Sequence, residues 1–227
     1  MRLRRLLRSP VRKVATWTIV VLLGLLLWAT LSIATLRFIN PPITAVQLER
    51  WIGGIGDDYE MRRTFVPLDR ISPNLRHAVI AAEDGRFYQH HGLDWVELGK
   101  VVSKGTKEGR FRRGASTITQ QLVKNLFLTT KGSFVRKIAE VPLALLAELL
   151  LPKARILELY LNVIEWGPGV FGAEAAARYH YHLSSAALSR DQAARLAAIL
   201  PSPRRWRPGN MNRYSAIIQG RMRRMGL

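Results

Sequence analysis

The sequence predicts a mainly α-helical protein: one N-terminal membrane-spanning helix, then a single helical domain. Three observations carry this prediction. Residues 14–36 contain no charged side chain, and the residues before them carry basic charges only. From about residue 43 onward, apolar residues recur at helical spacing between helix-capping signals. Strand signals are few, and residues 64–66 are the best candidate.

The apolar N-terminal segment has the length of a helix that spans a bilayer. At 1.5 Å per residue, residues 14–36 reach about 34 Å, against about 30 Å for a hydrocarbon core. A cleaved signal peptide has a shorter apolar region of about 7–15 residues, so the segment is interpreted as an anchor. The basic tail, residues 1–13, should stay in the cytoplasm, which places the domain outside it. We therefore expect a single-pass membrane protein with an extracytoplasmic domain.

Composition restricts the classes of function. The chain has 227 residues, 48% of them apolar, which is enough for a folded core. It has no cysteine, which excludes a disulfide scaffold, a thiol nucleophile and a cysteine-bound metal site. The net charge of +19 indicates an anionic partner. Because DNA is normally absent outside the cytoplasm, the charge points to anionic lipid or a lipid-borne phosphate.

The residues after the anchor divide into a linker and one domain. Residues 37–60 are predicted to be a linker or stalk that begins with a stiff Pro-Pro pair. Residues 61–227 form the predicted domain. Within it, residues 96–113 mix apolar, glycine and basic residues, which is typical of a mobile flap that contacts a membrane surface. The alternative for this segment is a solvated, charged loop.

Capping signals predict the helices of the domain. Ser72 is an N-cap before a first-turn proline, and capping boxes follow at Thr117 and Ser189. The first helix should end at Glu83, where Gly85 can stop it. The others are expected at residues 117–128, 134–151 with a kink at Pro142, 152–161, 189–200 and 212–225.

Two segments contain residues suited to chemistry at helix ends. Glu83 is flanked by apolar neighbours, and such a carboxylate has a raised pKa, as a general base requires. In residues 114–125, glycine and hydroxyl residues at a helix N-terminus leave backbone N–H groups free to bind an anion. Gln121, Lys124 and Asn125 share one polar face of that helix. The alternative for the first segment is a capping or ion-pair arrangement, and the alternative for the second is an ordinary capped amphipathic helix.

Two further segments complete the set. Arg136 and Glu140 are four residues apart, which alone predicts an intrahelical ion pair. Residues 153–162 have the periodicity of a buried helix.

In their order and spacing, these four segments resemble the motifs of glycosyltransferase family 51, the peptidoglycan polymerases. They match its patterns E-D-x-x-F-x-x-H-x-G, G-x-S-T-I-x-Q-Q-x-x-K-N, R-K-x-x-E and K-x-x-I-L-E-x-Y-L-N in full. Residues 165–172 are similar to the monofunctional members in particular. Bifunctional members add a penicillin-binding domain, whose Ser-x-x-Lys and Lys-Thr-Gly motifs this chain lacks.

The resemblance implies a lysozyme-like catalytic lobe and a small membrane-associated jaw at about residues 96–113. It implies that lipid II, a disaccharide-pentapeptide on undecaprenyl diphosphate, is polymerised into β-1,4-linked glycan with release of undecaprenyl diphosphate. Glu83 matches the base for the acceptor hydroxyl. Glu140 matches a second essential glutamate, which assists the leaving group through a divalent cation, Mg²⁺ in particular, or through basic residues. The resemblance assigns phosphate contacts to Lys124 and Arg136, and polar lining to Ser116, Gln121 and Asn125.

The chain departs from the family at two places. Many relatives have an arginine near residue 132, where this chain offers Lys131, which keeps the charge but loses bidentate phosphate geometry. Relatives often have Tyr-Phe-Gly where this chain has His180-Tyr181-His182, which puts the local turn in doubt. We expect these histidines to be surface or core residues rather than metal ligands. Structural support, rather than chemistry, is expected of Asp84, Glu158 and Asn162.

Two other functions compete with polymerisation. A lytic enzyme on the same lobe would cut glycan with one glutamic acid, and it would need no anchor, second glutamate or basic site. A non-enzymatic membrane scaffold would have no use for Glu83 and Glu140 at motif spacing. The expected partners are lipid II, the growing glycan and membrane lipids, without nucleic acid. The family resemblance alone suggests penicillin-binding transpeptidases, elongation or division proteins, and the inner membrane as the location.

Overall fold

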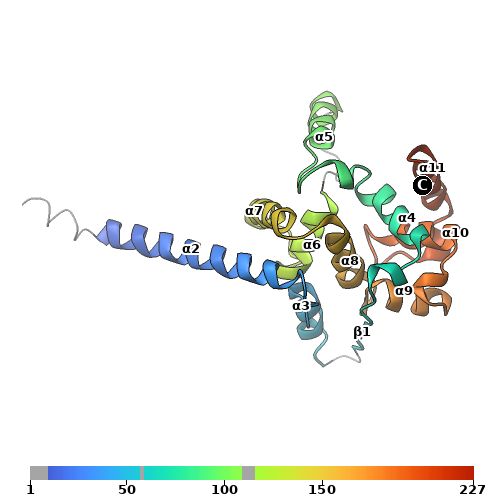
Figure 1. The fold of residues 1–227 in the computed structure, drawn as a ribbon, viewed down its shortest axis with the longest axis horizontal. Coiled ribbons are helices and arrows are strands. Elements are labelled where there is room, and N and C mark those ends of the chain that lie inside the picture. Colours follow the sequence, from blue (N-terminus) through green and yellow to red (C-terminus); the bar gives the residue numbers. More distant parts are fainter. Residues whose placement is uncertain (1–9, 57–58, 109–115) are drawn as a thin grey trace, which may run out of the picture. The chain divides into compact units, whose positions relative to one another are not determined.

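The computed structural model describes residues 10–56, 59–108 and 116–227. The chain divides into two compact units, with the boundary in the sequence between residues 39 and 40. The first unit contains helix α2 (Pro10–Thr35) (Figure 1). Within α2, Arg12–Thr35 is long and apolar enough to cross a membrane. The hydroxyls of Thr16, Thr18 and Thr30 donate to carbonyls four residues earlier, which satisfies these polar groups inside the helix. The helix predicted at residues 14–36 is confirmed, with an earlier start; most of the basic tail lies outside the described residues.

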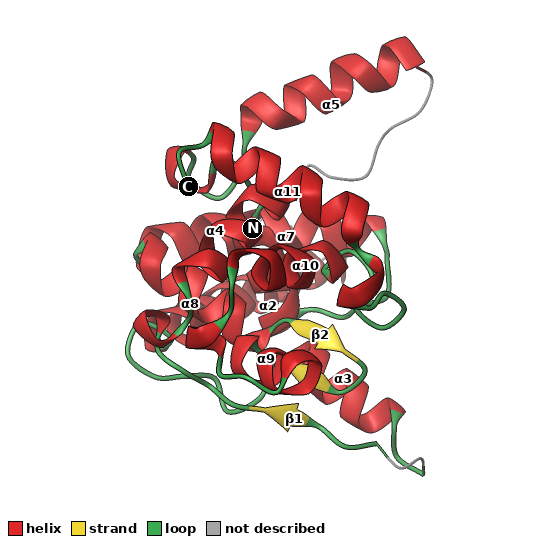
Figure 2. Cartoon of the chain, turned by 90° about the vertical axis from the view of Figure 1, so that its right-hand side faces the viewer, coloured by secondary structure: helices red, strands yellow, loops and turns green. Residues whose placement is uncertain are grey.

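The second unit, Asn40–Leu227, is mainly helical with one small sheet, as predicted (Figure 2). Its α-helices are α3 (Ala45–Gly53), α4 (Pro73–Glu83), α5 (Trp95–Glu108), α6 (Ile118–Phe127), α7 (Phe134–Leu150), α8 (Lys153–Val163), α9 (Ala173–Tyr181), α10 (Arg190–Ile199) and α11 (Asn212–Arg224). The strands are β1 (Arg62–Arg63), β2 (Glu165–Gly167) and β3 (Val170–Phe171). Short 3₁₀ helices lie at η1 (Leu68–Arg70), η2 (Phe87–Gln89), η3 (Ser185–Ala187) and η4 (Pro208–Asn210).

The capping signals start the helices where the sequence predicts. Ser72 accepts a hydrogen bond from the backbone of Asn74 at the start of α4. The capping boxes at Thr117 and Ser189 are both formed, at the starts of α6 and α10. Helix α7 contains Pro142, and Pro152 is the N-cap of α8.

Helix α8 lies in the core of this unit. Its side chains are buried on most of its circumference, as expected for a helix with neighbours on several sides. The buried residues are Ile156, Leu157, Leu159, Tyr160, Leu161, Asn162 and Val163. Helix α6 packs against α8, α7 and α3, while α4, α10 and α11 pack on one another. The packing around α6 therefore brings side chains from α3, α7 and α8 together.

The strand predicted at residues 64–66 lies at residues 62–63 instead. β1 pairs in parallel with β3, and β3 pairs antiparallel with β2. The chain leaves the sheet before Val66 because the Asn162 side chain hydrogen-bonds both the N–H and the carbonyl of Val66, at 2.9 Å each. The Asn162 side chain thus forms the two hydrogen bonds that the backbone of a neighbouring strand would otherwise form. This contact, together with the bond from the Leu68 N–H to Glu158, is the structural support expected of Asn162 and Glu158.

Part of the segment predicted to be a linker is folded. Helix α3 begins with a capping box formed by Thr44 and Gln47, both of which are buried. The helix packs against α6, so the compact unit begins at Asn40 rather than near residue 61. The Pro-Pro pair at residues 41–42 therefore lies at the start of this unit rather than in a long stalk.

The segment predicted to be a flap is helical in its described part. Helix α5 forms because Asp94 caps it: its carboxylate accepts a hydrogen bond of 2.9 Å from the backbone of Glu97. Both ribbon views show α5 extending away from the other helices of its unit (Figures 1 and 2). Trp95 and Val96 are exposed at its start. Residues 109–113 of the predicted flap lie outside the described residues.

The unusual His180-Tyr181-His182 turn has an energetic cost. His182 ends α9 with a φ of +57°, in the left-handed region that favours glycine. A non-glycine residue pays about 1–2 kcal/mol there. Because glycine also costs entropy on folding, we expect His182→Gly to stabilise the fold by a net amount of about 0.5–1 kcal/mol. Thermal unfolding measures this change; His182→Ala keeps the strain, and an equal gain from alanine would contradict the explanation.

Candidate active site

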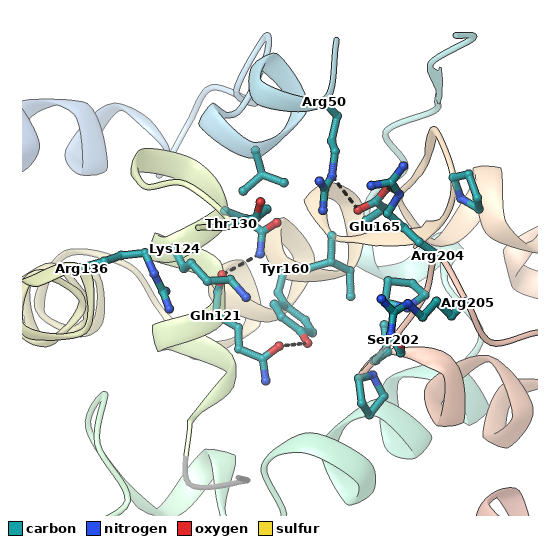
Figure 3. A pocket seen from close by; sticks show the side chains of 17 residues that line it. Arg50, Gln121, Lys124, Thr130, Arg136, Tyr160, Glu165, Ser202, Arg204 and Arg205 are labelled. Atoms are coloured by element: carbon teal, nitrogen blue, oxygen red, sulfur yellow. Dashed lines mark hydrogen bonds and ion pairs between the residues drawn. The ribbon is translucent and has the colours of Figure 1, made fainter. Parts of the chain in front are cut away.

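A cleft of about 650 Å³ opens beside α6, lined by side chains from α3, α6, α7, α8, β2 and the segment after α10. Figure 3 shows Gln121 and Tyr160 between two groups of cations. Lys124 and Arg136 lie on one side, and Arg50, Arg204 and Arg205 on the other. Glu165 is the acidic residue among those lining the cleft. This excess of positive charge favours an anionic ligand.

Glu83 lies at the end of α4 and connects to the cleft through Gln121. The Gln121 Nε2 donates to Glu83 Oε2 at 2.6 Å, and the Tyr160 hydroxyl donates to Gln121 Oε1 at 2.9 Å. Burial raises the pKa of Glu83, while the Gln121 hydrogen bond and the charge of Lys124 oppose the rise. A partly buried carboxylate with a raised pKa and a directed hydrogen bond suits a general base.

A second carboxylate, Glu140, holds two cations on α7. Its side chain is buried, and its two oxygens pair with Arg136 and Lys137. The Lys137 Nζ lies 2.7 Å from Glu140 Oε2 and also donates to the Ser116 hydroxyl at 2.8 Å. The ion pair predicted from the spacing of Arg136 and Glu140 is present. It belongs to a larger cluster that fixes two cations near the cleft.

Lys124 interacts electrostatically with both carboxylates. Burial lowers its pKa most; the charges of Glu140 and Glu83 oppose this effect, and Arg136 and Lys137 add to it. Asn125, also on the cleft, donates to the Gln121 carbonyl at 2.8 Å. The polar face predicted for Gln121, Lys124 and Asn125 therefore lines the cleft as one surface.

The N-terminus of α6 does not offer free N–H groups at Ile118 and Gln120, contrary to the prediction. Asp84 Oδ2 accepts from the Ile118 N–H at 3.0 Å, and the Thr117 hydroxyl accepts from the Gln120 N–H at 3.2 Å. The other oxygen of Asp84 lies 2.9 Å from His90 Nε2. The anion at this helix end is a protein carboxylate that ties α4 to α6, which is the structural support expected of Asp84.

The Lys131 side chain lines a neighbouring cavity of about 630 Å³ rather than the cleft itself. Arg50 and Arg204 line both cavities. The Lys131 carbonyl accepts from Arg136 Nε at 3.1 Å, so its backbone helps to place that arginine. A contact of the Lys131 side chain with substrate stays a prediction.

Several residues in or near the cleft were not predicted from the sequence. Lys137 stands three residues before Glu140, a spacing that predicts a second ion pair. Tyr160 is part of the fourth motif, but its periodicity indicates only a core position. Arg204 and Arg205 form a basic pair whose place at the cleft depends on the packing of α10. Outside the four motifs, the polar and charged residues that line the cleft are Arg50, Thr130, Glu165, Ser202, Arg204 and Arg205.

The fold and the cleft define a class of protein: a mainly helical enzyme that follows an apolar N-terminal helix in the sequence, with a carboxylate beside a cleft rich in cationic side chains. Residues 49–225 match the family model described as transglycosylase. A biosynthetic peptidoglycan transglycosylase of Dechloromonas aromatica is 43% identical over 224 residues, which cover 97% of this chain and 94% of the relative. One from Shewanella oneidensis is 43% identical over 220 residues, covering 95% and 94%. A third, from Thiobacillus denitrificans, is 56% identical over 147 residues, covering 65% and 63%. The chain therefore belongs to the transglycosylase family.

Proposed function

We propose that this chain is a peptidoglycan glycosyltransferase that polymerises lipid II into β-1,4-linked glycan strands and releases undecaprenyl diphosphate. Family membership supports the polymerisation of glycan for the cell wall. The observation that carries the proposal for the site is the position of Glu83. Through Gln121, its carboxylate is joined to a cleft whose other polar groups are mainly cations.

The proposed reaction is a single displacement. The 4-hydroxyl of the acceptor sugar attacks the anomeric carbon of the growing chain, and Glu83 takes the hydroxyl proton. The bond to the diphosphate breaks, and its electron pair leaves with undecaprenyl diphosphate. Negative charge grows on that leaving group, so fixed cations such as Lys124 and Arg136 stabilise the transition state. Attack opposite the leaving group inverts the configuration from α to β.

Glu140 is suited to position cations in this reaction. A buried carboxylate between Arg136 and Lys137 holds both side chains in place before substrate arrives. Pre-arranged charges need little reorganisation when the leaving group departs. In this role Glu140 is a positioning residue that acts through its two partners.

The expected divalent cation remains a proposal, and Glu140 does not fit a resident metal because both of its oxygens pair with cations. In the part of the chain that the structure describes, no group of three His, Cys, Asp or Glu side chains is placed to hold a metal. A divalent ion would then accompany the diphosphate as part of the substrate. We expect calorimetric titration of Mg²⁺ into the substrate-free chain to show no binding. Binding that disappears in Glu140→Gln would contradict this expectation.

An exposed apolar stripe on α7 supports contact with the membrane. Phe134, Ile138, Leu145 and Leu149 lie on one face of the helix, and Phe134 and Leu149 are 80% and 79% exposed. The same helix carries Arg136 and Glu140, so a lipid contact along this stripe would hold the cationic cluster near lipid headgroups. We propose this contact in addition to the one expected of α5. Association with transpeptidases or with elongation and division proteins stays a prediction.

The absence of cysteine makes this contact measurable, because a single introduced cysteine is the sole labelling site. We expect a fluorescent label at Leu149→Cys, in the full chain in liposomes, to be quenched by brominated lipid. A matched label at Arg213→Cys on α11 should not be quenched. Quenching that depends on protein concentration rather than on bromine would indicate contact between copies of the chain and would contradict the lipid contact.

Product analysis tests the proposed function. Purified full chain is incubated with lipid II in liposomes or detergent, and the products are separated by size. Polymer together with free undecaprenyl diphosphate is the expected result. Shortened glycan from added polymer would indicate a lytic enzyme, and no change in either substrate would indicate a binding scaffold; both would refute the proposal. The N-terminus is proposed to be cytoplasmic, which protease protection of the same liposomes can check.

A further inference from the structure

Gln121 bridges two groups that need opposite ends of its amide. Its Oε1 faces the Tyr160 hydroxyl at 2.9 Å, and its Nε2 faces Glu83 Oε2 at 2.6 Å. An ionised carboxylate can only accept hydrogen bonds, whereas a neutral tyrosine can donate one. The arrangement is therefore consistent only with one amide orientation, which has the nitrogen toward Glu83.

Tyr160 has the properties of a permanent donor in this bridge. Its side chain is fully buried in α8, and burial raises its pKa well above the usual value, with the charge of Glu83 adding to the rise. The hydroxyl therefore keeps its proton, and can donate it in a hydrogen bond, at neutral pH. The backbone of Gln121 is held separately, because its carbonyl accepts from Asn125 Nδ2. The orientation of the side-chain amide thus depends on Tyr160.

We propose that Tyr160 is a positioning residue, whose hydroxyl locks the Gln121 amide so that its N–H donates to Glu83 and keeps that carboxylate ready to accept a proton. This inference rests on the proposed function only in one respect, the role of Glu83 as the general base. In this proposal Tyr160 is neither the acid nor the base of the reaction; it acts through Gln121.

The consequence of losing the lock follows from the chemistry of the amide. Without the hydroxyl, the amide can rotate by about 180° and present its oxygen to Glu83. That oxygen repels an ionised carboxylate and accepts a hydrogen bond from a protonated one. The neutral form of Glu83 is therefore stabilised relative to the ionised form. The other groups that face Glu83 would stay as they are: Lys124 on α6, Asp84 after α4, and Arg221 and Tyr214 on α11.

The test uses Tyr160→Phe, which keeps the buried ring and removes only the hydroxyl. A general base must be ionised, so a rise in its pKa moves the acid limb of the activity profile to higher pH. We expect the acid limb of kcat for lipid II polymerisation to move up by about one pH unit. At pH values below the wild-type midpoint kcat should fall about 10-fold, with KM little changed and recovery at higher pH. Tyr181→Phe is the matched control, since its buried hydroxyl has no hydrogen-bond partner among the described residues.

A second measurement reads the protonation of Glu83 without using activity. Water-soluble carbodiimide with an amine modifies protonated carboxyl groups, and peptide mass spectrometry reports the extent at Glu83 as a function of pH. The modification midpoint should rise in Tyr160→Phe and in Gln121→Met, and the double variant should shift no further than Gln121→Met alone. Additive shifts, or an unchanged midpoint in Tyr160→Phe, would overturn the inference.

The two measurements separate failure of this inference from failure of the proposed function. If the midpoint shifts but wild type polymerises nothing, Tyr160 positions Gln121 as proposed and the assigned reaction is wrong. If wild type polymerises and the midpoint does not shift, the reaction stands and the lock is wrong. A uniform loss of activity at all pH values would show a merely structural role for Tyr160.

Discussion

Glu83→Gln lowers the rate of lipid II polymerisation by about 10²–10⁴-fold, the usual contribution of a general base. Glutamine keeps the size of the side chain but cannot take the proton of the acceptor hydroxyl. KM for lipid II should change little, because the cations of the cleft are untouched. Steady-state kinetics on matched preparations measure the loss.

Stability distinguishes this role from a structural one. Because burial raises the pKa of Glu83 in the folded state, its ionisation at neutral pH opposes folding. The stabilising effect of its raised pKa is present below the unfolded pKa and is lost as the pH rises through the folded pKa. Glu83→Gln should therefore melt at or above the wild-type temperature at neutral pH.

A carboxylate with a structural role provides the matched control. Glu174 is buried and accepts hydrogen bonds from the Ser185 backbone and from Arg178, which lower its pKa. Glu174→Gln should lose stability and keep the chemical step. A folded Glu83→Gln variant that polymerises at the wild-type rate would remove Glu83 as the base.

Lys124→Ala reduces the use of lipid II by about 10–100-fold. A hydrogen bond to a charged group is worth about 1.5–3 kcal/mol, and Lys124 lines the cleft within electrostatic reach of both carboxylates. The loss should appear in kcat/KM and should shrink at high salt less than the loss of an exposed charge would, because Lys124 is partly buried.

The control for this charge deletion is Arg223→Ala, an exposed cation on α11. It changes the net charge equally and should leave kcat/KM within a factor of about two, since exposed charges are screened by salt. An equal loss in both variants would mean that overall charge, rather than a phosphate contact, governs substrate use.

Much of the helical fold is predictable because its signals are local. Ser72, Thr117 and Ser189 start helices through contacts within a few residues, and the structure forms all three caps. The strand was predicted at the wrong residues because the side chain of Asn162, far away in the sequence, hydrogen-bonds the backbone N–H and carbonyl of Val66. Asp84 similarly occupies the start of α6, which no pattern around Thr117 could indicate.

The residues of the site likewise divide into those placed by local spacing and those placed by long-range packing. Gln121, Lys124 and Asn125 share a helix face, so their common position on the cleft follows from spacing alone. Tyr160 could not be recognised, because its periodicity is that of a core residue and its hydroxyl matters only once α8 packs against α6. Arg204 and Arg205 reach the cleft through the same kind of long-range packing, in the segment after α10.

The configuration of the newly formed glycosidic bond tests the central claim most directly. If Glu83 is a base for direct attack on an α-linked diphosphate donor, nuclear magnetic resonance of polymer made by the wild-type chain shows β-1,4 linkages only. Mass spectrometry of the enzyme trapped during turnover then shows no sugar attached to Glu83. New α linkages, or a glycosyl adduct on Glu83, would mean that this carboxylate is a nucleophile and would contradict the account.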